Sequence, residues 1–290
     1  MTEMERVLAL KTLPLFADLD PEQLDAVASK ARLSDYSAGE RIRVSPRRAR
    51  RLSIVIAGRV RARLVDGSEA IYERHQVLGG AAALARPELL QAAEAAEAST
   101  CLVLGYDHME ELVFDSFSLA HAMIRGAARS VRRERRALPV TKTRRRHRRE
   151  AFRSQLVERV ALMSATRSLG ALSVRVLSEL AREAKPVRLS AGENLWREGD
   201  TARHAFVLRS GQIEVGADDR YVVHAPAVVG SVDALAEERR RWSATMIRSG
   251  DGLRLEARSF LDVLEDDSHA ALETLRLLST AAMHVSSRPL

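Results

Sequence analysis

The sequence predicts an α+β protein, mainly β, built from two tandem double-stranded β-helix (jelly-roll) domains with flanking helices. Two observations lead to this prediction. The phrase "SAGE" begins at Ser37 and again at Ser190, and the apolar and glycine positions from residue 19 to residue 58 recur at the same offset of 153. This register indicates an internal duplication whose period is too long for a solenoid repeat. Each copy then continues with short strand-like stretches between turn residues, which is typical of small antiparallel barrels.

Each copy is predicted to open with a short helix, followed by strands. In the first copy Asp20 suits the N-cap and Pro21 suits the first helical position. In the second copy Ser173 is the expected cap. The expected strand pairs are 51–65 with 69–74, around a turn at Asp66-Gly67-Ser68, and 205–217 with 220–225, around Asp218-Asp219.

Each copy is predicted to end in helices. Asp107 and Glu110 have the spacing of a capping box for a helix that begins there. The following helix, between residues 116 and 138, carries an apolar stripe that can pack on its own domain, on the other domain or on a second chain. The stripe consists of Ala120, Met123, Ile124, Ala127 and Val131.

The length of 290 residues and the duplication favour two domains, 1–138 and 154–290, joined by a basic linker at 139–153. The single cysteine, Cys101, excludes an intrachain disulfide and is expected to be buried in an apolar strand. The acidic N-terminus lacks the features of a signal peptide. No apolar run approaches the roughly 18 residues of a membrane span, so we expect a cytoplasmic protein.

Positive charge is concentrated between residues 125 and 153. Twelve arginines and one lysine against two glutamates give this segment a net charge of +11, while the whole chain is +7, so the rest sums to −4. The segment is either a solvated connector or a site for an anionic partner, which could be nucleic acid, an acidic protein or a lipid surface. The residues of this predicted anionic-partner patch are Arg132, Arg133, Arg135, Arg136, Arg144, Arg145, Arg146, Arg148 and Arg149.

On these residues the chain resembles the cyclic nucleotide-binding domain family. The family includes bacterial catabolite-activator regulators and the regulatory subunits of cyclic-AMP-dependent kinase. The resemblance is carried by 37–40 and 54–60 in the first copy and by 190–193, 198–200 and 207–211 in the second. It covers nearly the whole chain apart from the linker, and it implies two jelly-roll domains.

The family's phosphate-binding cassette reads roughly Phe-Gly-Glu, a short helix, then Arg-Ala-Ala-Thr. Backbone amides and the arginine hold the cyclic phosphate, and the glutamate binds the ribose hydroxyl. In the first cassette (77–100) Gly79 matches the glycine and Gly80 replaces the glutamate. Counting back from Thr100, past Ser99, puts Glu97 where the arginine belongs. A carboxylate repels a phosphate, so we expect the first copy not to bind cyclic nucleotides.

The second cassette (228–245) keeps Gly230, while Ser231 replaces the glutamate and Trp242 falls on the arginine position. Two neighbouring arginines could reach a phosphate if the loop bulges, but the carboxylate that would bind the ribose is missing. We therefore expect a structural relic, and the alternative is a site for a cyclic mono- or dinucleotide. The pocket positions of this copy are Gly230, Ser231, Arg240, Arg241, Trp242, Ser243 and Thr245.

No catalytic or metal-binding pattern is found in the sequence. The eight histidines are scattered, and phosphate loops, nucleophile elbows and Rossmann fingerprints are lacking. The two tryptophans are expected to be packing residues. We therefore expect no enzyme, no metal and no cofactor.

The sequence thus predicts a non-enzymatic regulatory or scaffold protein that acts through protein–protein contacts. The resemblance also implies a homodimer through the helix at 116–138. We expect no helix-turn-helix output module, because Leu290 follows the last helix closely. The alternatives are a second-messenger sensor using the second copy and a nucleic-acid-binding protein using residues 125–153.

Overall fold

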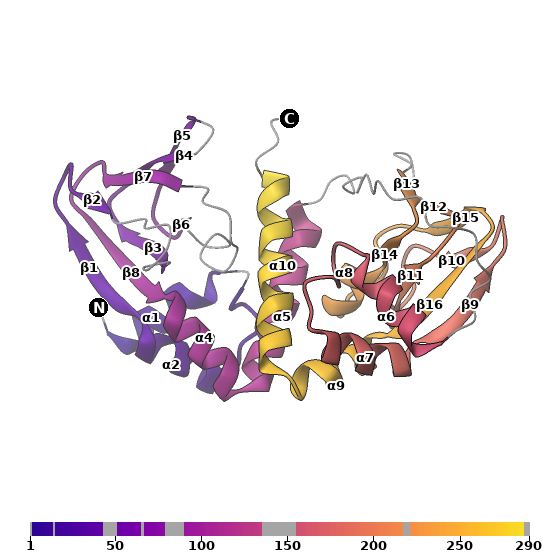
Figure 1. The fold of residues 1–290 in the computed structure, drawn as a ribbon. Helices are drawn as coiled ribbons and strands as arrows, with labels where there is room; N and C mark the ends of the chain where they lie inside the picture. Colours follow the sequence, from indigo (N-terminus) through magenta and orange to yellow (C-terminus); the bar gives the residue numbers. More distant parts are fainter. Residues whose placement is uncertain are drawn as a thin grey trace. The chain divides into compact units, whose positions relative to one another are not determined.

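The computed structural model describes residues 2–13, 15–42, 51–64, 67–78, 90–134, 155–216 and 221–286. The chain divides into two compact units (Figure 1). The first unit comprises Met1–Val131 and Leu275–Leu290, and the second comprises Arg132–Thr274. The second half of the last helix thus clusters with the first unit, and the domain boundaries given above remain predictions.

In the described residues of the first unit, two four-stranded antiparallel sheets have the orders β1-β8-β3-β6 and β2-β7-β4-β5. The strands are β1 (Arg32–Tyr36), β2 (Arg41–Ile42), β3 (Arg51–Ala57), β4 (Val60–Leu64), β5 (Glu69–Tyr72), β6 (Val77–Leu78), β7 (Leu90–Ala95) and β8 (Ser99–Gly105). The helices are α1 (Glu3–Lys11), α2 (Pro21–Lys30), α4 (Tyr106–Asp115) and α5 (Phe117–Glu134), whose last three residues cluster with the second unit.

The described part of the second unit repeats this pattern, with sheet orders β14-β11-β16-β9 and β10-β15-β12-β13. Its strands are β9 (Lys185–Leu189), β10 (Asn194–Trp196), β11 (His204–Leu208), β12 (Gln212–Val215), β13 (Tyr221–His224), β14 (Ala227–Val229), β15 (Ala244–Arg248) and β16 (Gly250–Glu256). Its helices are α6 (Leu156–Ser164), α7 (Val174–Glu183), α8 (Ser231–Leu235), α9 (Ala257–Glu265) and the start of α10 (Ser268–Ser286). The predicted fold class, mainly β jelly rolls with flanking helices, is confirmed.

The repeated "SAGE" phrase forms the same tight turn in both units. In the first, the backbone amide of Ser37 donates to the carboxylate of Glu40 at 2.9 Å, and in the second, Ser190 donates to Glu193 at 2.8 Å. The glycine between them has a positive φ in both copies, +78° and +86°, which few other residues adopt without strain. The phrase therefore recurs because the same backbone turn, with its own internal hydrogen bond, is built twice.

The predicted helix starts are largely confirmed. Asp20 caps α2 in a capping box and Pro21 is its first residue. Ser173 caps α7. The capping box predicted at Asp107 is wrong, because α4 begins directly after β8 with Gly105 as its N-cap and no side-chain cap bond. Asp107 instead lies in the first helical turn, where its charge favours the helix dipole.

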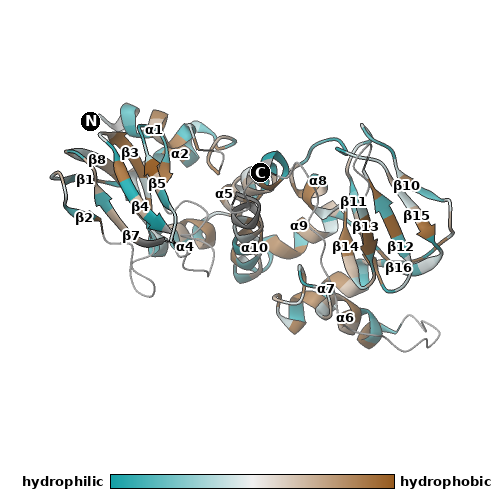
Figure 2. Ribbon diagram, turned by 90° about the horizontal axis from the view of Figure 1, so that it is seen from above, coloured by the Kyte–Doolittle hydropathy of each residue, from teal (hydrophilic) through white to brown (hydrophobic). Residues whose placement is uncertain are grey.

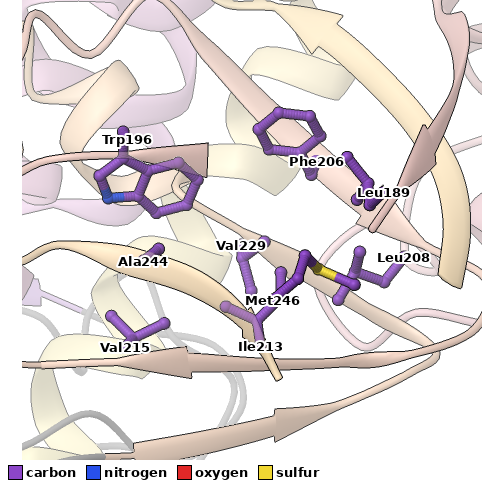
Figure 3. Packing of buried hydrophobic residues seen from close by; sticks show 9 residues of the cluster. All are labelled: Leu189, Trp196, Phe206, Leu208, Ile213, Val215, Val229, Ala244 and Met246. Carbon is purple, nitrogen blue, oxygen red and sulfur yellow. The ribbon is translucent and has the colours of Figure 1, made fainter. Parts of the chain in front are cut away.

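Each unit buries an apolar core between its two sheets. Figure 2 shows that β3 and β11 are mostly hydrophobic, as expected for strands at the centre of a core. The core of the second unit contains Trp196, Phe206, Leu208, Ile213 and Met246 among its members, and Figure 3 shows these side chains pointing toward one another. In the first unit Cys101 is fully buried in the corresponding core, and burial raises the pKa of its thiol to about 11.

Strand pairing gives the alignment between the two units. Arg41 of β2 lies opposite Glu94 of β7, and Asn194 of β10 lies opposite Thr245 of β15. The offset is therefore 153 at β2 and 151 at β7. The offset has already changed to 151 at β5, the hairpin partner of β4. Val60 of β4 pairs with Tyr72, while its equivalent Ile213 of β12 pairs with Val223. Counted between these equivalent pairs, the β12–β13 hairpin is thus two residues shorter than the β4–β5 hairpin.

The apolar stripe on α5 is buried within the single chain. Its five members are each at most 5% exposed. A homodimer remains a prediction, but this stripe does not offer an open apolar surface for it.

Candidate functional site

The second cassette begins where β14 ends and α8 starts. Gly230 is the N-cap of α8 and adopts a left-handed conformation with φ +79°. Ser231, at the position of the family's glutamate, is the first residue of this five-residue helix. A loop then leads back to β15, and the arginines at 239–241 lie on this loop.

Arg240 turns inward from the loop and is only 2% exposed. Its Nη1 donates to the carbonyl of Gly230 at 2.6 Å, and its Nη2 donates to the carbonyl of His204 on β11. Its guanidinium carbon lies 4.2 Å from the centroid of the Trp196 ring, close enough for a cation–π interaction. Burial lowers the pKa of Arg240, while the carboxylates of Asp233 and Asp200 act in the opposite direction.

Trp196 connects Arg240 with the core. The rings of Trp196 and Phe206 stack with centroids 6.1 Å apart, and both are labelled in Figure 3. The indole Nε1 of Trp196 donates to the carbonyl of Trp242 at 2.9 Å, which fixes the loop just before β15. The sequence indicated only a packing role for Trp196 and no role for His204. Only the tertiary structure shows that both residues contact the cassette, because His204 lies 36 residues from Arg240 in the sequence.

Arg241 and Trp242 follow Arg240 on the same loop and are both half-buried. Arg241 stacks over the Trp242 ring, 4.8 Å from its centroid, and donates to the carbonyl of Arg132. Trp242 is partly buried against the core of the second unit. Both arginines near the family's arginine position thus direct guanidinium donors at backbone carbonyls.

The end of the second cassette is held by hydrogen bonds to neighbouring segments. The hydroxyl of Ser243 accepts a bond from the amide of Glu198 at 3.0 Å. The hydroxyl of Thr245 donates to the side chain of Asn194 at 2.7 Å, across the β10–β15 pair. These bonds tie Ser243 to the turn that follows β10 and Thr245 to β10 itself.

In the first cassette, Gly79 and Gly80 lie outside the described residues. Glu97 lies in the turn between β7 and β8 and forms a two-pronged ion pair with Arg59, at 3.2 and 2.9 Å. This bond holds the pKa of Glu97 below its ordinary value. Ser99 bonds to the backbone of Arg59, and Thr100 donates to Asp35 on β1 at 2.6 Å.

The strand register does not support the alignment that placed Glu97 at the arginine position. With the offset of 151, Thr245 corresponds to Glu94, and Trp242 corresponds to Gln91. Thr100 belongs to β8, after the cassette has ended. The sequence "AST" at 98–100 therefore resembles the cassette's end only by coincidence, and the expected repulsion by Glu97 is replaced by its pairing with Arg59.

Of the predicted anionic-partner patch, the structure describes Arg132 and Arg133. Arg132 belongs to the second unit and forms ion pairs with Asp233, at 2.7 Å, and with Glu238. Its charge is therefore offset by two carboxylates. Arg133 is exposed on α5. Arg135, Arg136, Arg144, Arg145, Arg146, Arg148 and Arg149 lie outside the described residues.

Among the described residues, no group of three or more histidine, cysteine, aspartate or glutamate side chains could hold a metal ion. The helices in this part of the chain are also too short or too polar to cross a membrane.

The segment from β9 to α9, with the short helix α8 between β14 and β15, has the pattern of a known domain family. Residues 186–267 match the family model of the cyclic nucleotide-binding domain. The resemblance expected from the sequence is confirmed over this segment. A search of curated proteins finds no match.

Solved structures similar to this chain come from several organisms. The regulatory domain of Toxoplasma gondii PKA with cAMP is 17% identical, with 97% of each chain covered and a TM-score of 0.35. The regulatory subunit of a cAMP-independent protein kinase A from Trypanosoma cruzi, bound to guanosine, is 15% identical, covering 91% of this chain and 85% of that one, with a TM-score of 0.36. The N-terminal domain of a transcriptional regulator from Streptomyces coelicolor A3(2) is 24% identical, covering 47% and 99%, with a TM-score of 0.39.

Proposed function

We propose that this chain is a non-enzymatic, cytoplasmic regulatory or scaffold protein whose two units keep the cyclic nucleotide-binding fold without binding a cyclic nucleotide. It acts through protein–protein contacts. The observation that carries this proposal is the arrangement of the arginines in the second cassette. Arg240 and Arg241 both donate to backbone carbonyls, and Trp242 occupies the position where the family places its phosphate-binding arginine.

The first cassette supports the same conclusion. The positions equivalent to Arg240, Arg241 and Trp242 are Leu89, Leu90 and Gln91, none of which carries a positive charge. At the glutamate position the two units have Gly80 and Ser231, so neither supplies a carboxylate for a ribose hydroxyl. A cyclic phosphate needs a charge-assisted donor of this kind for tight binding.

The test is a titration of the full chain with cyclic AMP, cyclic GMP and cyclic dinucleotides. A ligand present at a hundred times its dissociation constant stabilises the folded state by about 2.7 kcal/mol, which a thermal-shift assay detects readily. We expect no shift with any of these ligands, and calorimetry should show no heat of binding. A saturable shift with the unmodified chain would refute the proposal and support a second-messenger sensor.

A matched variant shows whether the assay can detect binding in this fold. Ser231→Glu with Trp242→Arg restores the two charged groups that the family uses. The Trp242 carbonyl bonds to Trp196 through the backbone, so this contact can persist in the variant. We expect the double variant to gain affinity for a cyclic nucleotide relative to the unmodified chain.

A further inference from the structure

Arg240 is among the largest fully buried side chains of the described residues, although arginine is seldom buried completely. Its backbone is fixed on both sides: its amide donates to the carbonyl of Asp200 at 2.7 Å, and its carbonyl accepts from the amide of Gly199 at 2.9 Å. The side chain therefore enters the interior from a firmly held point of the loop. The inward direction of the side chain thus follows from the backbone hydrogen bonds of the loop.

The guanidinium of Arg240 joins three elements of the second unit. It donates to the carbonyl of Gly230, the N-cap of α8, and to the carbonyl of His204 on β11, and it stacks on Trp196 of β10. We name these three contacts the Arg240 bridge. A planar fork with several donors can bond two carbonyls and stack on an aromatic face at once, which a lysine cannot do.

The packing around the bridge is close. A side chain built on Gly230 would place its Cβ 2.6 Å from Nη1 of Arg240 and 3.0 Å from the Trp196 ring. The third donor of Arg240, Nε, is buried and has no hydrogen-bond partner among the described residues. A buried cation with an unsatisfied donor contributes little to overall stability, but it can specify one conformation of the elements it joins.

We propose that the Arg240 bridge holds the short helix α8 against the β-roll in one conformation without a ligand, so that the second unit is closed permanently. This inference deepens the proposed function, and it rests on that function for the claim that no nucleotide holds α8 in place. Arg240 is then a positioning residue for the cassette. A partner of the second unit would meet the same surface around α8 at every nucleotide concentration.

The test is hydrogen exchange of the full chain, comparing Arg240→Met with the unmodified protein. Arg240→Met keeps the apolar stem of the side chain but removes the guanidinium, and with it both carbonyl bonds and the contact with Trp196. We expect the amides of residues 231–238 to exchange at least about tenfold faster, while those of β12 and β13 stay unchanged. The control is Arg239→Met, which removes the neighbouring charge from an exposed arginine whose side chain donates to the carbonyl of Gly199.

Unchanged exchange at 231–238 in Arg240→Met would overturn the inference, and so would equal acceleration in Arg239→Met. If Arg240→Met does not fold, Arg240→Lys decides: it keeps the charge but cannot form the whole bridge, so exchange should again accelerate. Wild-type exchange in Arg240→Lys would overturn the inference. The outcome is separable from the proposed function, because nucleotide binding by the unmodified chain would refute that function and leave this comparison intact.

Discussion

Gly230→Ala should destabilise the second unit by more than the cost of placing an alanine at a positive φ. Gly230 has a φ of +79°, a conformation that L-residues adopt at a cost. Unlike Gly192 and Gly199, which have a positive φ but no atom within 4 Å of the position of a Cβ, Gly230 also lies against side chains. Its missing Cβ would meet Nη1 of Arg240 at 2.6 Å and the Trp196 ring at 3.0 Å.

The magnitude follows from two separate contributions. Placing alanine in the left-handed region costs about 1–2 kcal/mol. Forcing an additional methyl group into a packed site costs about 1–3 kcal/mol. We therefore expect Gly230→Ala to lower the free energy of unfolding by about 2–5 kcal/mol. Gly192→Ala is the matched control, because Gly192 has a φ of +86° and no atom within 4 Å of the position of its Cβ. It should cost only about 1–2 kcal/mol.

The assay is urea unfolding followed by tryptophan fluorescence. Both tryptophans, Trp196 and Trp242, lie in the second unit, so the signal reports this unit without a contribution from the first. Equal losses in Gly230→Ala and Gly192→Ala would refute the reasoning, because the contact with the bridge would then carry no energy.

A double-mutant cycle identifies the contact responsible. Combined with Arg240→Ala, the cost of Gly230→Ala should fall toward that of the Gly192 control, since the closest atom has been removed. Additive losses in the double variant would show that Arg240 is not the side chain that Gly230 accommodates.

Two further predictions concern ionisable groups. With its pKa raised to about 11 by burial, Cys101 should be roughly one part in a thousand thiolate at pH 8, so a thiol reagent should react with it only after unfolding; rapid labelling of the native chain would contradict this. Burial first, then the charges of Arg254 and Arg240, lower the pKa of His204 below its ordinary 6.5, with Glu256 opposing. The unfolded chain therefore takes up this proton at higher pH, so the stability from His204 is complete above about pH 6.5 and falls as the pH drops toward the folded pKa. In His204→Gln the free energy of unfolding should thus vary less between pH 8 and pH 5 than in the unmodified chain. An unchanged pH dependence would contradict this role of His204.

The fold could be predicted from the sequence because its signals are local. The turn at Ser37, the capping box at Asp20 and the hairpin glycines depend on residues within a few positions of one another. Such turn and cap chemistry is decided by backbone geometry, which a short stretch of sequence specifies. The missed start of α4 is a small shift of the same kind, where a strand passes into a helix without a side-chain cap.

The cassettes could not be aligned in the same way. The register depends on strand pairs that the sequence does not show, and a two-residue difference in the length of one hairpin shifts the alignment of everything after it. Residues 98–100 offered a false match in the first copy. The inward direction of Arg240 was equally hidden, since its acceptor at His204 and its stacking partner Trp196 come from other strands.

The comparison between the two units separates what the fold requires from what a ligand would require. The turn at 37–40 and 190–193, the strand orders and the central pairings recur. The positions that would hold a nucleotide do not: Gly80 and Ser231 differ, as do Gln91 and Trp242, and neither pair supplies the expected charges. Arg240, by contrast, is buried in the second unit with two of its donors on backbone carbonyls. The buried guanidinium is thus more informative than the missing residues, because its own donors bond the carbonyl at the start of α8 and the carbonyl of His204 on β11.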